Sequence, residues 1–227
     1  MGIVIVVLLV LVLIFGPGLW VKRVLETYSE PNDRYNGTGA QLARHLLDLN
    51  GLQKVGVEKT EAGDHYDPVD KMVRLTEDKY DGGSLTAITV AAHEVGHAVQ
   101  DKEEYAPLVW RSRLVRATQK VEKLGAGILM FAPFVGAITR APGLGLIMMA
   151  GGFMTLATSA LVHLVTLPTE IDASFGRAMP MLKRHNILHE SDDKHARKLL
   201  KAAAYTYVSA SLMSLLNVAR WWAILRR

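Results

Sequence analysis

The feature that most constrains the fold of this chain is an uncharged apolar run at its N-terminus. Residues 1–21 contain no charged side chain, and Lys22 and Arg23 follow directly. A helix needs about 20 apolar residues to cross the ~30 Å hydrocarbon core of a bilayer. The alternative, a cleaved secretory signal, has a basic start, a shorter apolar core and a small-residue cleavage site, and none of these is evident. The run therefore predicts an uncleaved transmembrane anchor.

Three further blocks of the chain are apolar. Residues 124–139 and 141–169 are separated by a single arginine and contain no other Asp, Glu, Lys or Arg. Residues 202–219 form the last block, and the paired tryptophans that follow suit a membrane interface. The alternative for blocks of this length is the core of a soluble helical protein. We expect the blocks to cross the membrane, which makes the chain a multi-pass protein.

Polar segments separate these blocks, at residues 22–123 and 170–201. The formal net charge of +4 is modest, and the basic residues are scattered or lie beside apolar blocks. Because no block of lysine and arginine is interleaved with aromatic residues, we do not expect nucleic-acid binding. The chain has no cysteine, which excludes disulfides and thiolate metal ligands.

The first polar segment contains patterns of local structure. Thr38 precedes an amphipathic stretch and predicts a capped helix. Two β-like pieces, residues 54–60 and 71–77, flank a turn-rich segment and predict a β-hairpin. Ser84 then precedes a long apolar stretch and predicts the N-cap of a second helix.

A histidine pair with an adjacent glutamate lies on this second helix. The sequence AAHEVGHAVQ, residues 91–100, places His93 and His97 four residues apart, so that both imidazoles project on one side of the helix. They can bind one ion, and zinc is expected because it accepts neutral imidazole. Glu94, rotated by about 100°, can reach a zinc-bound water and act as general base. This is the H-E-x-x-H arrangement of metallopeptidases; the alternative is two histidines on a polar helix face beside a chance glutamate.

A catalytic zinc has three protein ligands and one open position, so a third ligand is required. Glu170 is the best choice because it follows an apolar block at the predicted membrane boundary and begins a new helical stretch. Two predicted spans separate it from His93, and an even number of crossings returns the chain to the same side. The other candidates are His65, His163, Asp172, His185, His189 and His195.

Beyond this pattern, the chain resembles a known family over nearly its whole length. The stretch DHYDPVDKMVRLTEDKYDGGSLTAITVAAHEVGHAVQ, then YAPL, LVTLPTEIDAS and TYVSASLMSLL, is similar to the YugP-like neutral zinc metallopeptidases of bacterial membranes. The resemblance implies a gluzincin-type peptidase with one catalytic zinc ion. It also implies that His93, His97 and Glu170 are the zinc ligands and that Glu94 is the catalytic acid/base.

One position departs from the pattern of the distantly related HtpX-type peptidases. Those proteins have E-x-x-A-D after the zinc helix, whereas this chain has Glu170, Ala173 and then Ser174 in place of the aspartate. The partner that orients a ligand histidine is therefore not assigned, and Ser174 and Asp172 are the candidates to replace it.

The predicted fold class is mainly α, with multi-pass membrane helices and a small α+β, zincin-like (HExxH) catalytic unit that contains a short β-hairpin or sheet. The predicted parts are a transmembrane anchor (1–21), the zincin-like catalytic region (22–123), a transmembrane helical hairpin (124–169), a polar helical segment with the third ligand (170–201) and a C-terminal transmembrane or membrane-associated helix (202–227).

The predicted function is that of an integral-membrane zinc endopeptidase that cleaves peptides or proteins, membrane proteins among the candidate substrates. The resemblance implies a bacterial plasma membrane, and the distribution of lysine and arginine predicts that the site faces the cytoplasm. A homo-oligomer or a membrane-protein partner is left open. Candidates for stabilising the transition state are Arg177, His185, Tyr205 and Tyr207. The alternatives are a scaffold protein with a structural zinc site and a transporter with intramembrane polar residues.

Overall fold

The computed structural model describes residues 2–115 and 166–206, together with isolated positions from 117 to 162 and residue 209. The chain divides into two units. One unit consists of residues 1–17, 110–166 and 207–227. The other, here called the core unit, consists of residues 18–109 and 167–206.

Helices predominate among the described elements. In chain order the elements are α1 (Gly2–Thr27), α2 (Gly39–Leu49), β1 (Gly56–Lys59), β2 (His65–Asp67), β3 (Met72–Leu75), α3 (Glu77–Tyr80), α4 (Leu85–Lys102), the π-helix η1 (Asp172–Ala178), α7 (Met179–Arg184) and the 3₁₀ turn η2 (Glu190–Asp192). Residues 106–115, 166–171 and 193–206 are also helical.

The two helices predicted in the first polar segment are confirmed, including their caps. The Thr38 hydroxyl accepts a hydrogen bond from the Gln41 backbone N–H, and the Gln41 side chain accepts one from the Thr38 backbone N–H, which is a capping box. The Ser84 hydroxyl accepts a hydrogen bond from the Ala87 N–H at the start of α4. Every residue from Leu85 to Gln100 is buried, so α4 is the central helix of the core unit.

The two β-like pieces belong to a small sheet, as expected, but their predicted pairing as a β-hairpin is wrong because they pair in parallel. The sheet order is β1-β3-β2, with β1 parallel to β3 and β2 antiparallel to β3. Parallel strands need a connection long enough to return the chain to the same end. The turn-rich segment provides this connection, and its His65–Asp67 part adds a third strand that the sequence pattern did not reveal.

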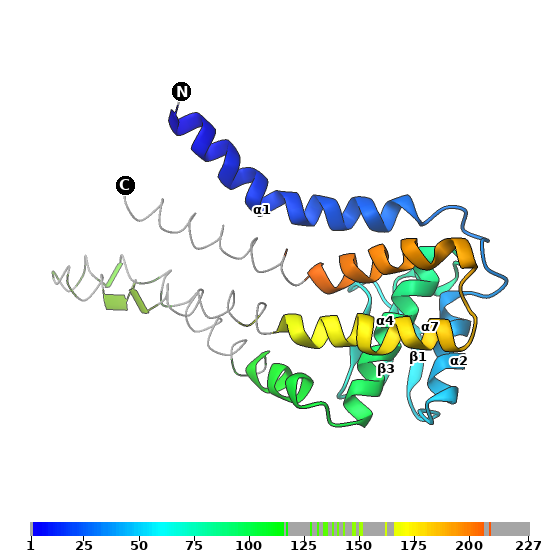
Figure 1. Ribbon diagram of the computed structural model, residues 1–227. Coiled ribbons are helices and arrows are strands. Elements are labelled where there is room, and N and C mark those ends of the chain that lie inside the picture. The colour runs from blue at the N-terminus through cyan, green and yellow to red at the C-terminus, as the bar shows by residue number, and fades with distance from the viewer. Residues whose placement is uncertain are drawn as a thin grey trace. The chain divides into compact units, whose positions relative to one another are not determined.

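The core unit has a main hydrophobic core and a smaller cluster. The elements α2, β3, α4 and α7 lie close together (Figure 1). Leucines of α2, valines of β3 and α4, and residues of α7 form the main core. Val21 and Val24, near the C-terminal end of α1, form the smaller cluster with residues that include Ala196 and Leu199 of helix 193–206. This second cluster holds both helices against the start of α4.

The prediction of multi-pass membrane helices is wrong. In the part of the chain that the structure describes, no helix combines the length and apolar composition required to cross a membrane. Helix α1 covers the predicted anchor but continues through Lys22, Arg23 and Glu26, and Val21 and Val24 are buried within the core unit. The same finding overturns the multi-pass plasma-membrane localisation. The other predicted spans, 124–139, 141–169 and 202–219, lie largely outside the described residues.

A buried ion pair joins the N-terminal and C-terminal parts of the core unit. Arg34 donates two hydrogen bonds to Asp192, of 2.7 and 2.6 Å, and the Tyr35 hydroxyl donates a third of 2.7 Å. The Asp192 side chain is 1% exposed. The hydrogen bond from Arg34 holds the pKa of the Asp192 carboxyl below its ordinary value, while burial and then the hydrogen bond to Asp192 raise the pKa of Tyr35.

Asp192→Asn should lower the free energy of unfolding at pH 7 by about 1–3 kcal/mol. Breaking a fully buried pair costs more, but Arg34 remains 35% exposed and keeps part of its hydration. Because the pKa of Asp192 is lowered in the folded state, its contribution is complete above the ordinary aspartate pKa of about 3.9 and is lost as the pH falls through the folded-state value. The difference between wild type and variant should therefore shrink below about pH 4, as measured by urea denaturation followed by circular dichroism.

The neighbouring Asp193→Asn is the matched control, because its carboxylate is 38% exposed and pairs with Lys183 and Arg197 at the surface. We expect a loss of less than about 1 kcal/mol from this change. Equal losses of unfolding free energy in both variants would contradict a stabilising role for the Arg34–Asp192 pair. So would a difference between wild type and Asp192→Asn that persists unchanged to pH 3.

Candidate metal centre

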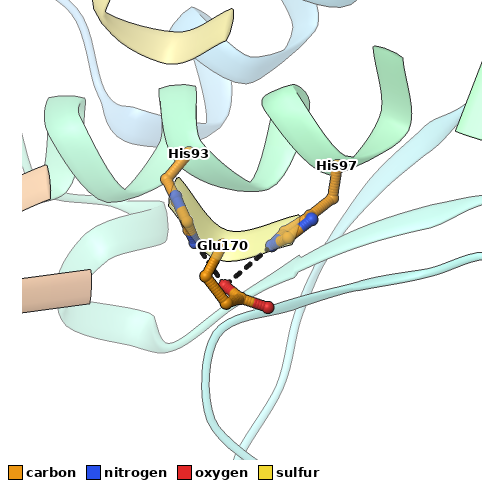
Figure 2. A group of neighbouring side chains, drawn as sticks. All are labelled: His93, His97 and Glu170. Carbon is orange, nitrogen blue, oxygen red and sulfur yellow. Dashed lines mark hydrogen bonds and ion pairs between the residues drawn. The ribbon is translucent and has the colours of Figure 1, made fainter. Parts of the chain in front are cut away.

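Two imidazoles and one carboxylate converge inside the core unit. His93 and His97 project from the same side of α4, and their rings face the Glu170 side chain (Figure 2). Glu170 belongs to the helical residues 166–171. The Oε2 atom of Glu170 lies 3.3 Å from Nε2 of His93 and 3.2 Å from Nε2 of His97. All three residues are buried, at 4%, 5% and 0% exposed, and one ligand atom from each lies within 4.8 Å of the others. The three residues are called here the metal trio.

Close packing of two helices brings the metal trio together. The i, i+4 spacing places both histidines on one side of α4, as expected for 3.6 residues per turn. Gly96 lies between them in sequence, and a Cβ at this position would stand 2.6 Å from the carbonyl oxygen of Ala173 in η1. The missing side chain of Gly96 thus lets η1, and the helical turn with Glu170 before it, approach α4 at backbone contact.

Hydrogen bonds hold the outer nitrogen of each ring. Nδ1 of His97 lies 2.9 Å from Oε1 of Gln100, whose amide nitrogen donates to the Thr169 carbonyl at 2.9 Å and to Asp172 Oδ2 at 2.8 Å. Nδ1 of His93 lies 3.0 Å from the hydroxyl of Ser174. Both imidazoles therefore point their Nε2 atoms at Glu170.

The donor set of the metal trio fits a zinc ion. Two imidazole nitrogens and a carboxylate oxygen are common zinc ligands, and three protein ligands leave the fourth position for water or substrate, as in catalytic sites. Each Nε2 faces the carboxylate while each Nδ1 has a partner in the surrounding protein. The two nitrogens and the carboxylate oxygen lie close enough together to bind one divalent cation.

Glu94, the predicted acid/base, is buried on α4 next to His93. It does not belong to the metal trio, in agreement with its rotation of about 100° from His93 around the helix. Its catalytic role remains a prediction.

The other candidates for the third ligand lie elsewhere, as far as the structure describes them. Asp172 contacts Gln100 and Arg177 rather than an imidazole of the trio. His65 pairs with the Gly63 carbonyl, His185 with the ring of His45, His189 with Tyr35 and His195 with Tyr28, whereas His163 is outside the described residues.

The described candidates for transition-state stabilisation contact residues outside the metal trio. Arg177 forms ion pairs with Glu103 and with Asp172. Burial lowers the pKa of Arg177, but the hydrogen bond to Glu103 and the charge of Asp172 outweigh this and raise it. Tyr205 packs edge-on against Trp20, and the predicted Tyr207 lies outside the described residues.

Sequence reasoning missed two features around the metal trio. The first is Gln100, whose place three residues after His97 puts it on the next turn of the same helix face. The second is the π-helical form of Asp172–Ala178, for which the sequence has no recognised pattern. π-Helical turns are uncommon and occur often at functional sites.

Comparisons with known proteins agree with a zinc site at the metal trio. A family model described as "Putative neutral zinc metallopeptidase" matches residues 3–226. The chain is similar to the "Putative membrane protease YugP" of Bacillus subtilis (strain 168), with 36% identity over 203 residues that cover 88% of this chain and 86% of that protein. No solved structure matches the chain.

Gly96→Ala should weaken zinc binding about tenfold or more, because its Cβ would meet the Ala173 carbonyl and force η1 away from α4. Overpacking should also lower the free energy of unfolding by about 1–3 kcal/mol. Zinc affinity is measured by competition with a chromophoric chelator, and stability by thermal unfolding.

Gly16→Ala in α1 is the matched control, since the nearest described contact for its Cβ is Val12 Cγ1 at an ordinary 3.9 Å. Wild-type zinc affinity in Gly96→Ala would show that backbone contact between the two helices does not determine the geometry of the metal trio.

Proposed function

The chain belongs to the family described as "Putative neutral zinc metallopeptidase", and we propose that it is a zinc-dependent peptidase that hydrolyses bonds within peptides or proteins. His93, His97 and Glu170 are the proposed zinc ligands, and Glu94 is the proposed general base and acid. The observation that carries the proposal is the convergence of three buried ligand atoms from helical turns 73 residues apart in sequence.

The residues of the metal trio fit the requirements of zinc catalysis. When bound, zinc polarises a carbonyl group and lowers the pKa of water. His93 and His97 contribute neutral nitrogen ligands from a helix that is buried on all sides, so their positions are fixed before substrate arrives. Glu170 adds one negative charge, and its burial keeps bulk water from competing for the ion.

Glu94 is the residue proposed to move the proton that peptide hydrolysis requires. Water adds its oxygen to the carbonyl carbon, the carbon–nitrogen bond breaks, and one proton passes from the water to the leaving amine. A carboxylate next to the reacting atoms can accept that proton and deliver it to the amine. Glu94 is buried on the helix that carries both imidazoles, and its position after His93 directs it away from direct ligation.

A scaffold with a structural zinc site is the competing proposal. A structural zinc is normally closed by four protein ligands. The metal trio supplies three, and no fourth His, Cys, Asp or Glu joins it among the described residues. This observation favours the catalytic proposal.

Glu94→Gln should retain one zinc per chain while kcat falls by about 10²–10⁴-fold, because the amide cannot accept the proton of the attacking water. Glu170→Ala should instead lose zinc, because it removes a ligand of the trio. Metal analysis of the purified chain and turnover of a fluorogenic peptide library measure the two effects separately.

Glu61→Gln, at an exposed loop position, is the matched control and should retain both zinc and turnover. Peptide cleavage that survives Glu94→Gln would rule out the proposed mechanism. Zinc content without turnover in the wild type would favour the scaffold.

A further inference from the structure

We infer that Ser174 and Gln100 are positioning residues that fix the tautomers of the two ligand histidines, and that Asp172 acts on the metal trio only through Gln100. The inference rests on the proposed function, since it takes His93 and His97 as the zinc ligands. Each partner accepts a hydrogen bond from one Nδ1–H, so each ring presents the lone pair of Nε2 to the metal. A neutral imidazole has one N–H and one lone pair, and the partner of the N–H decides which nitrogen can bind metal.

The orientation of the Gln100 amide follows from its neighbours. Its other two partners, the Thr169 carbonyl and the Asp172 carboxylate, only accept hydrogen bonds, so the amide NH₂ group must face them. The amide oxygen therefore faces His97, and at 2.9 Å it accepts the proton of Nδ1. The proton on Nδ1 leaves Nε2 of His97 as the ligand atom.

The direction of the Ser174 hydroxyl follows in the same way. A serine hydroxyl has one proton, and Ser174 donates it to the Leu200 carbonyl at 3.1 Å. Toward His93, at 3.0 Å, the hydroxyl oxygen can then only accept, which places the ring proton on Nδ1. Both contacts are buried, so water does not substitute for either partner.

The Leu200 carbonyl explains why serine is suited to position 174. An ionised aspartate there would accept from His93 but would have no proton for Leu200, and two acceptors would face each other in a buried space. Serine satisfies both groups with one hydroxyl. Serine in place of the aspartate of the E-x-x-A-D pattern is thus explained by the neighbouring helix, whose Leu200 carbonyl accepts the hydroxyl proton of Ser174.

The π-helix η1 places the supports of both histidines in one segment. Ser174 faces His93, while Asp172 accepts from the Gln100 amide and from Nε of Arg177, five residues further along the chain. Five residues is the repeat of π-helical hydrogen bonding, so the wide turn brings Arg177 beside Asp172. The carboxylate of Asp172 is thus held from two sides, by the Gln100 amide and by Arg177. Arg177 also pairs with Glu103, just past the end of α4.

The test uses the full chain labelled with ¹⁵N-histidine and loaded with zinc, and compares Ser174→Ala with Gln100→Met. Each substitution removes one acceptor and keeps the position filled. Each should weaken zinc binding about 10- to 100-fold in competition with a chromophoric chelator, the usual effect of removing a partner of a ligand histidine.

The decisive measurement is the ring Nδ1–H signal in ¹H–¹⁵N spectra. The wild type should show two such protons that exchange slowly with water, one from each ligand histidine. Ser174→Ala should lose the slow exchange of His93 alone, and Gln100→Met that of His97 alone. Ser174→Thr keeps the hydroxyl and should restore both the signal and the zinc affinity.

Thr89→Val is the matched control, because it removes a buried hydroxyl of α4 that has no hydrogen-bond partner among the described residues. It should leave both signals in place. Unchanged exchange in Ser174→Ala and Gln100→Met, or loss of both signals in each, would overturn the inference. Selective loss in a chain that cleaves no peptide would support the inference and reject the proposed function, whereas a wild type that binds no zinc would reject both.

Discussion

The contact between α4 and η1 at Gly96 is the constraint on which the rest of the structure depends. At this point two helical backbones touch with no side chain between them, and a single Cβ would separate them. The contact fixes the distance from the imidazoles of α4 to the Glu170 carboxylate. It also brings Ser174 to the outer nitrogen of His93 and Asp172 to Gln100, the partner of His97. Helix packing and metal-site geometry are therefore determined by the same interaction.

The local structure around the site could be predicted from sequence because short-range signals specify it. Thr38 and Ser84 lie where helix caps are required, and the i, i+4 spacing of His93 and His97 predicts a shared helix face whatever surrounds it. The family was also recognisable from motifs spread along the chain, and the match over residues 3–226 confirms that prediction. The roles of Glu94 and Glu170 and the five predicted parts remain predictions.

The failures arose where non-local contacts decide the outcome. Hydropathy alone treats an apolar run as a candidate membrane span, but it does not register that α1 continues through charged turns and that Val21 and Val24 are buried in the core unit. Two β-like pieces around a turn suggest a hairpin, yet the long connection permits parallel pairing and an added strand. Ser174, the partner of His93, comes from η1, and no local pattern reveals that the Leu200 carbonyl faces a donor at position 174.

Charge balance links the site to the stability of the core unit. Glu94 and Glu170 are both buried in the core unit, so the site contains two groups that are negatively charged when ionised. An uncompensated charge in a protein interior raises the free energy of the folded state. A divalent cation bound by the metal trio neutralises such negative charge within the site. Ser174 and Gln100 fit this arrangement because they orient the rings without adding charge, whereas a carboxylate on either ring would make the balance more negative. Since an ion that binds only the folded chain stabilises it by mass action, the metal and the helix contact at Gly96 reinforce each other.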